Sequence, residues 1–370
     1  MQSAKRIPEL DGLRATAILL VVAWHYLGMR GGIGSLGWQV LAFGRGGVDL
    51  FFALSGFLIT RILLRHIDAP NYFSAFYGRR CLRILPIYSV VVGVWLLTKI
   101  GRINDGDLPW WSYVLGIQNF FMAIKQTYGA YSLSATWSLA VEEQFYLFFP
   151  LIVLHTPRRY FLPLLLSLAV LCPIGRAVCY SLGDRFGYYV LTPFRADILA
   201  VGAIVAWFEC WPPSPRVAAI FRSIFWTTLL LFPAFVFAVG QNGDAAWAYL
   251  GHTYLGLLCG SILFMVAWNT GASEMAFLRS APALFFARIS YALYLVHGAV
   301  FANINGAFGN SLLASPIVAI LSFAISVLIC VVSYRFLEEP MIRLGHRKFS
   351  YQPPARRATS VRYGRDTVKP

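Results

Sequence analysis

The stretch LDGLRATAILLVVAWHY (Leu10–Tyr26) is an apolar run with an arginine near one end and a histidine near the other. Arg14 and His25 are eleven residues apart, so on a helix they point within roughly 20° of the same direction. The helical rise separates them by about 16 Å, around half of a bilayer core. Ionisable side chains inside a membrane segment usually have a functional role, although a histidine there can also be a buried residue whose hydrogen bonds are satisfied. The run therefore predicts a membrane helix with two chemically active residues.

The composition indicates a protein with several membrane spans. Of 370 residues, 58% are hydrophobic and 13% are charged, whereas soluble domains carry about 25% charged residues. The 31 Lys and Arg outnumber the 16 Asp and Glu. Cytoplasmic loops of membrane proteins are rich in Lys and Arg, which accounts for this excess. A nucleic-acid partner would also fit a basic chain, but no motif supports one. The six cysteines form no Cys-x-x-Cys pair, so neither a metal site nor a disulfide framework is expected.

Apolar runs of about 17–25 residues predict an all-α integral membrane bundle. The first run lacks a small-residue cleavage site and is interpreted as a retained span. Residues 108–130 are aromatic but interrupted by polar residues, and are expected to form an interfacial loop. The arginine-rich loops place both termini in the cytoplasm, in a plasma or inner membrane. About ten spans are expected, at residues 11–29, 47–65, 84–100, 137–155, 160–180, 195–211, 218–240, 246–268, 284–304 and 313–337.

The chain divides into two regions. Residues 1–345 are predicted to form one membrane-embedded domain. Residues 346–370 contain Pro, Arg and Ser with little apolar content, and predict a basic, disordered cytoplasmic tail. Its charge could hold it against anionic lipid.

A first group of ionisable residues falls near the outer ends of several spans. A carboxylate beside a histidine fixes its tautomer, and the histidine can then take a proton from a hydroxyl. We therefore expect His25 to pair with Asp49, Glu142 or Glu143 as the catalytic group. Glu142 and Glu143 are about 100° apart on a helix, so at most one should point fully into a site; acids also favour helix N-termini without any catalytic role. The outer group comprises His25, Asp49, Glu142, Glu143, Arg195, Asp197 and His297.

A second group of ionisable residues falls on the predicted inner side. The run YGRRCLRILPIY (Tyr77–Tyr88) carries Arg79, Arg80 and Arg83 within five positions. The planar guanidinium suits phosphate oxygens, so these arginines and Arg14 are candidate ligands of a phosphorylated donor. The alternative is the ordinary excess of positive charge in cytoplasmic loops.

An inner anion-binding face and an outer acid–base face fit transfer of a group from a cytoplasmic donor to an external hydroxyl. A secondary transporter with an intramembrane proton relay of His and carboxylates is the alternative function. A non-catalytic lipid-binding scaffold is a third interpretation, which the acids of the outer cavity disfavour.

The motifs together resemble the acyltransferase-3 family, whose members are integral membrane enzymes that O-acylate extracytoplasmic carbohydrates. The resemblance extends over nearly the whole chain to about residue 345. It rests on LDGLRA…H with Arg14 and His25, GGVDLFFALSGFLIT (Gly46–Thr60), the arginine run, WSLAVEEQFY (Trp137–Tyr146), Arg195-Ala-Asp197, SYALYLVH (Ser290–His297) and FLEEP (Phe336–Pro340).

This resemblance implies an acyl-CoA donor, such as acetyl-CoA, bound from the cytoplasm as a substrate and not as a permanent cofactor. It implies that Arg14 and His25 are the essential pair and that Arg80 and Arg83 bind the donor. The expected acceptor is a carbohydrate or lipid-linked glycan, positioned by Trp137, Arg195, Asp197 and His297. Some members carry a further C-terminal domain; from its length, this chain is expected to complete the transfer in the membrane or hand the acyl group to another protein.

Overall fold

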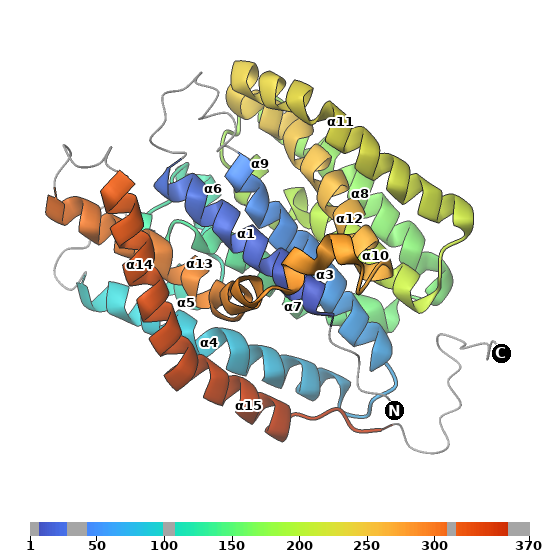
Figure 1. Ribbon diagram of the computed structural model, residues 1–370, viewed down its shortest axis with the longest axis horizontal. Coiled ribbons are helices and arrows are strands. Elements are labelled where there is room, and N and C mark those ends of the chain that lie inside the picture. Colours follow the sequence, from blue (N-terminus) through green and yellow to red (C-terminus); the bar gives the residue numbers. More distant parts are fainter. Residues whose placement is uncertain (1–6, 28–42, 99–107, 309–315, 354–370) are drawn as a thin grey trace.

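The computed structural model describes residues 7–27, 43–98, 108–308 and 316–353, and this part of the chain is helical without strands (Figure 1). The long helices are α1 (Pro8–Tyr26), α3 (Gly46–Arg65), α4 (Tyr72–Thr98), α7 (Thr136–His155), α8 (Arg158–Ser181), α10 (Ala196–Cys210), α11 (Pro215–Ala246), α12 (His252–Trp268), α13 (Ala281–Phe308) and α14 (Pro316–Ser333). Shorter segments connect them: η2 (Phe43–Arg45), α5 (Trp110–Val114), α6 (Gln118–Lys125), η3 (Tyr131–Leu133), α9 (Gly187–Val190), η4 (Thr192–Phe194), η5 (Trp247–Gly251), η6 (Ser273–Arg279), η8 (Tyr334–Glu338) and α15 (Glu339–Lys348).

Each predicted span coincides with one of the long helices, as far as its residues are described. Seven continuous helical stretches of the described chain are long and apolar enough to cross a membrane, and one of them joins α11 to α12. α1, with three charged residues, and the 15-residue α10 fall outside these seven. The architecture is therefore consistent with a membrane protein, while the number of spans and the side of each terminus stay predictions.

Helices α1, α3, α10 and α13 form the centre of the bundle, with α3 packed on α1 and α10, and α1 packed on α13 (Figure 1). Two glycines permit the close crossing of α3 and α10. A Cβ atom at Gly56 would overlap the carbonyl oxygen of Leu199, and one at Gly202 would overlap that of Ala53. Small residues commonly allow such close approach between membrane helices.

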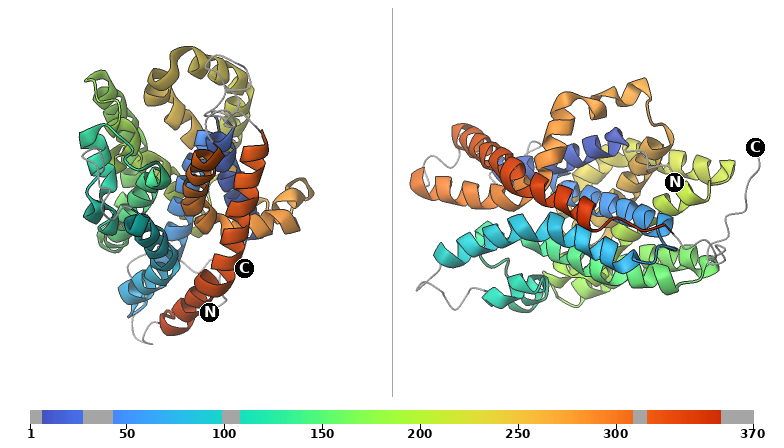
Figure 2. Two further views of the ribbon diagram at one scale, coloured as in Figure 1. Left: turned by 90° about the vertical axis from the view of Figure 1, so that its left-hand side faces the viewer. Right: turned by 90° about the horizontal axis from the view of Figure 1, so that it is seen from below.

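The segment expected to be an interfacial loop, residues 108–130, contains the two short helices α5 and α6 and no stretch long enough to cross a membrane. At the other end of the chain, α15 lies along α4 (Figure 2).

The chain stays packed beyond the predicted domain boundary at residue 345. Arg79 Nε donates a hydrogen bond to the Phe349 carbonyl (2.7 Å), and the Tyr351 ring stacks on His66 with ring centres 3.9 Å apart. Asn71 also donates to the Ser350 carbonyl (2.8 Å). Part of the region predicted as a disordered tail is therefore fixed against α4 and the loop before it, whereas residues 354–370 lie outside the described chain.

Candidate functional site

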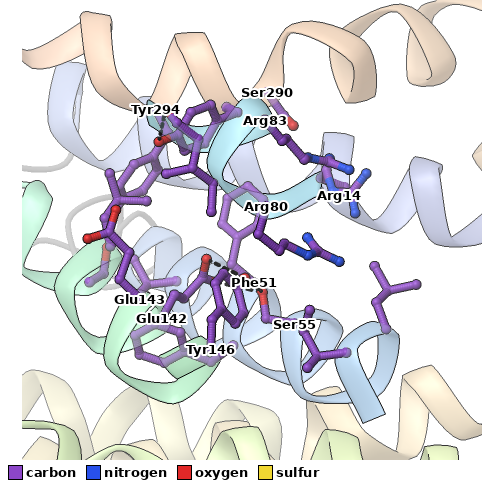
Figure 3. A pocket seen from close by; sticks show the side chains of 18 residues that line it. Arg14, Phe51, Ser55, Arg80, Arg83, Glu142, Glu143, Tyr146, Ser290 and Tyr294 are labelled. Atoms are coloured by element: carbon purple, nitrogen blue, oxygen red, sulfur yellow. Dashed lines mark hydrogen bonds between the residues drawn. The ribbon is translucent and has the colours of Figure 1, made fainter. Parts of the chain in front are cut away.

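A cavity of ≈ 90 Å³ lies between α1, α3, α4, α7 and α13, and we call it the arginine cavity (Figure 3). One wall is cationic and the opposite wall carries carboxylates and hydroxyls, with apolar side chains between them. The polar residues that line it are Arg14, Ser55, Arg80, Arg83, Ser138, Glu142, Glu143, Tyr146, Ser290, Tyr291 and Tyr294.

The cationic wall is built from two helices. Arg14 comes from α1, and Arg80 and Arg83 come from α4, where their spacing of three residues places them on one helix face. Figure 3 shows the three guanidinium groups on the same side of the cavity. The structure thus brings together three of the four arginines predicted to bind the donor.

Arg79 is placed differently from its neighbours on α4. The central carbon of its guanidinium lies 4.9 Å from the centre of the Tyr351 ring, and its Nε is bonded to the Phe349 carbonyl. The side chains that line the described part of the arginine cavity do not include Arg79. Arg79 thus holds the C-terminal segment against α4, and its predicted role in binding the donor finds no support in this arrangement.

The opposite wall of the arginine cavity holds a hydrogen-bonded triangle. Ser55 Oγ donates to Glu142 Oε1 (2.7 Å), and the Tyr146 hydroxyl lies 3.0 Å from Glu142 Oε2 and 3.1 Å from Ser55 Oγ. Glu143 also lines the cavity, and its Oε1 is buried without a hydrogen-bond partner in the described structure. Both glutamates therefore reach the same cavity as the arginines, whereas helix geometry alone predicts that at most one points into a site with His25.

A second hollow of ≈ 40 Å³, which we call the histidine pocket, lies at the end of α1. Its lining residues are Val21, Trp24, His25, Gly44, Arg45, Val48, Ala135, Trp137, Tyr189 and Tyr294. Val48 and Tyr294 also line the arginine cavity, so the two hollows share a wall.

The local hydrogen bond of His25 determines which ring nitrogen is available. Nδ1 lies 2.8 Å from the Val21 carbonyl oxygen, which can only accept a hydrogen bond. This geometry assigns the proton of the neutral ring to Nδ1 and leaves the lone pair on Nε2. The histidine is thereby arranged to accept a proton through Nε2.

His297, on α13, is the ring that contacts His25. The ring centres are 4.9 Å apart in a T-shaped arrangement, and His297 Nδ1 lies 2.9 Å from the Leu293 carbonyl. Its Nε2 is buried without a hydrogen-bond partner among the described residues. Tyr26 fixes this part of α13 by donating to the His297 carbonyl (3.0 Å).

Asp49, Arg195 and Asp197 belong to a buried ionic network between α3, α8, α10 and α12. Asp49 Oδ1 pairs with Arg195 Nη2 (2.5 Å), and Asp49 Oδ2 lies 3.4 Å from His252 Nδ1. Asp197 pairs with Arg176 at 3.1 Å. All of these side chains are at most 5% exposed, so the network joins helices in the interior.

Arg195 is enclosed by aromatic rings. Its guanidinium carbon lies 5.4 to 5.7 Å from the ring centres of Phe52, Trp137 and Tyr189. Trp137 and Tyr189 also line the histidine pocket, so they stand between the ionic network and His25. In the described structure the hydrogen bonds of Asp49 and Glu142 go to groups other than His25.

Sequence reasoning does not select several residues of these sites. Ser55 and Tyr146 lie within the quoted motifs. Tyr146 follows Glu142 by four residues, so helix spacing could have placed it beside Glu142, whereas Ser55 reaches Glu142 from a different helix. His252 is an ionisable residue within an apolar run, the same signal that identifies His25. No group of three His, Cys, Asp or Glu side chains in the described ranges is arranged to hold a metal ion.

Comparisons with known proteins agree on one family. The acyltransferase-3 family model, described as an acyltransferase domain, matches residues 7–335. O-acetyltransferase OatA of Staphylococcus aureus strain NCTC 8325 is 27% identical over 381 residues, which cover 95% of this chain and 60% of OatA. A S. aureus strain COL protein, provisionally named an O-acetyltransferase, is 31% identical over 379 residues, which cover 94% of this chain and 59% of that protein. The chain thus spans about three fifths of the length of these relatives, and no solved structure matches it. The chain belongs to the acyltransferase-3 family.

Proposed function

We propose that this protein is a membrane-bound O-acyltransferase. It moves an acetyl or other short acyl group from cytoplasmic acyl-CoA to a hydroxyl of an extracytoplasmic or lipid-linked carbohydrate, such as an exopolysaccharide or O-antigen. The observation that carries the proposal is the pair of hollows with a shared wall, one lined by three arginines and the other by His25. About ten spans in a plasma or inner membrane, with cytoplasmic termini, complete the proposed arrangement.

The arginine cavity supplies the donor site. Coenzyme A carries several phosphate groups, and Arg14, Arg80 and Arg83 present guanidinium groups from one wall. Arginine binds phosphate oxygens through paired, charge-assisted hydrogen bonds. The apolar lining, which includes Phe51, can accommodate the extended pantetheine arm as it reaches toward Tyr294.

His25 supplies the proposed base. Its Nε2 accepts the proton of the sugar hydroxyl while that oxygen attacks the thioester carbonyl carbon. The new C–O bond forms, the C–S bond breaks, and the proton on the imidazole passes to the sulfur to give the CoA thiol. A relay in which Nε2 carries the acyl group between donor and acceptor uses the same atom.

The remaining predicted residues have proposed roles set by their contacts. Glu142 and Glu143 face the arginines across the cavity and balance their charge when no donor is bound. His297 lies against His25 and positions it, while Trp137 offers an aromatic face to the acceptor sugar. Asp49 holds Arg195 behind that face, and Asp197 extends the same network.

The test uses the purified protein in liposomes with acetyl-CoA labelled in the acetyl group. The proposal predicts release of the CoA thiol and transfer of label to a base-labile ester on glycan from the host membrane. His25→Ala should stop both while the protein inserts at normal levels. Proton-coupled solute movement without thiol release would instead support the secondary transporter.

A further inference from the structure

The histidine pocket contains a cation that the proposed reaction does not use. Arg45 ends η2 immediately before α3, and two glycines bring it close to α1. A Cβ atom at Gly44 would overlap the Leu20 carbonyl oxygen, and one at Gly47 would overlap that of Ala17. The close approach of the two helices places Arg45 in the same pocket as His25.

Aromatic rings hold the Arg45 guanidinium in place. Its central carbon lies 4.7 Å from the Trp24 ring centre and 5.8 Å from that of Trp247. Its ion-pair partner within the described chain is Asp244, whose side chain is 66% exposed and lies 3.5 Å away. Exposed pairs of this kind are weak, so the positive charge of Arg45 stays available to another anion.

Arg195 provides an instructive contrast within the same region. It contacts Trp137 and Tyr189 from behind the pocket, but its charge is paired with the buried carboxylate of Asp49 at 2.5 Å. Arg45 lines the pocket directly, beside the proposed base. Its charge is therefore the better placed of the two to contact an acceptor.

We propose that Arg45 selects an acceptor sugar that carries an anionic group, a carboxylate or a phosphate, near the hydroxyl to be acylated. This inference rests on the proposed function. The guanidinium fork binds either group through paired hydrogen bonds, while Trp137 and Tyr189 contact the apolar face of the sugar ring. Arg45 thereby orients the hydroxyl toward His25.

The test measures binding by isothermal titration calorimetry on the full chain in detergent. The carboxylate probes are trigalacturonate and its fully methyl-esterified form; the phosphate probes are mannose 6-phosphate and mannose. In one of these pairs the unmodified protein should bind the charged form about tenfold more tightly, and the pair that shows this identifies the anion. Arg45→Gln should remove the difference, and Asp244→Asn should preserve or increase it.

Arg185→Gln is the matched control, because Arg185 also lies over an aromatic ring, Tyr180 at 4.1 Å, but does not line the pocket. It should leave the preference unchanged. The inference is overturned if the unmodified protein binds charged and neutral forms equally, or if it binds neither charged form. It is also overturned if Arg45→Gln loses affinity for the charged and neutral forms equally. Failure of the proposed function is seen separately, as absence of thiol release from acetyl-CoA.

Discussion

His25 and His297 lie with their ring centres 4.9 Å apart, and each directs Nδ1 at a carbonyl oxygen four residues earlier in its own helix. The two rings therefore have the same neutral tautomer, with the lone pair of each on Nε2. α1 and α13 bring them together from positions far apart in the chain. This contact gives the proposed base a neighbour that restricts its orientation.

Replacing His25 with Asn should lower acyl transfer by about 10²–10⁴-fold, the usual contribution of a general base. The KM for acetyl-CoA should change little, because the arginines bind the donor. His155→Asn is a matched control: His155 makes the same kind of bond to the Leu151 carbonyl (2.9 Å) but lies outside both hollows. Steady-state kinetics of thiol release compare the two variants. Full activity of the His25 variant would show that His25 has no part in the mechanism.

Arg80→Gln should raise the KM for acetyl-CoA by about 10–100-fold, since a hydrogen bond to a charged group contributes about 1.5–3 kcal/mol. Arg79→Gln should affect the KM much less, because Arg79 contacts Phe349 and Tyr351. A donor titration at fixed acceptor concentration compares the two. Equal increases for both variants would contradict the assignment of the donor to the arginine cavity.

Arg195→Met should destabilise the protein by about 3–5 kcal/mol, because it leaves the Asp49 carboxylate buried without its partner. The double variant Asp49→Leu/Arg195→Met should be more stable than the sum of the two single changes predicts. Thermal unfolding in detergent provides the comparison. If Arg195→Met instead keeps its stability and loses only acceptor use, Arg195 contacts the acceptor directly.

Asp184 should make the free energy of unfolding vary with pH in the acid range. Burial by itself raises the pKa of Asp184, but hydrogen bonds from the backbone N–H groups of Gly187 (2.7 Å) and Phe186 (2.9 Å), together with those from the Gln126 and Cys179 side chains, outweigh burial and hold the pKa below its usual value. A lowered pKa in the folded state stabilises the protein above the unfolded pKa of about 4, and this stabilisation is lost as the pH falls toward the folded value.

Asp184→Asn should therefore unfold at a lower temperature than the unmodified protein at pH 7, and the difference should shrink as the pH falls below about 4. These bonds fix the start of α9, which carries Tyr189 to the histidine pocket. A difference that stays constant with pH would show that the carboxylate charge has no part in the effect.

The periodicity of apolar residues predicted the helices well, because burial in lipid or in the bundle imposes long apolar runs. Arg14 and His25, which fall in one apolar run, likewise lie on one helix, and each lines one of the two hollows. Patterns of this kind depend only on residues that are close together in the chain, so they can be recognised from the sequence alone.

The pairing of charges depends on how distant helices meet, and local patterns do not contain that information. Asp49 and Arg195 are 146 residues apart and come together because Gly56 and Gly202 allow α3 to cross α10 closely. Arg79 and Arg80 are adjacent, but their side chains leave α4 in different directions, one toward Phe349 and the other into the cavity. The sequence could name these residues but not their partners.

Donor binding and proton transfer are proposed to use separate hollows, and measurements of CoA affinity can distinguish the two roles. Calorimetry of CoA with the unmodified protein, His25→Ala and Arg83→Gln separates the two roles. His25→Ala should bind CoA like the unmodified protein and have no transfer activity, while Arg83→Gln should lose most of its CoA affinity. Unchanged CoA affinity in Arg83→Gln, together with lost affinity in His25→Ala, would contradict this separation of roles.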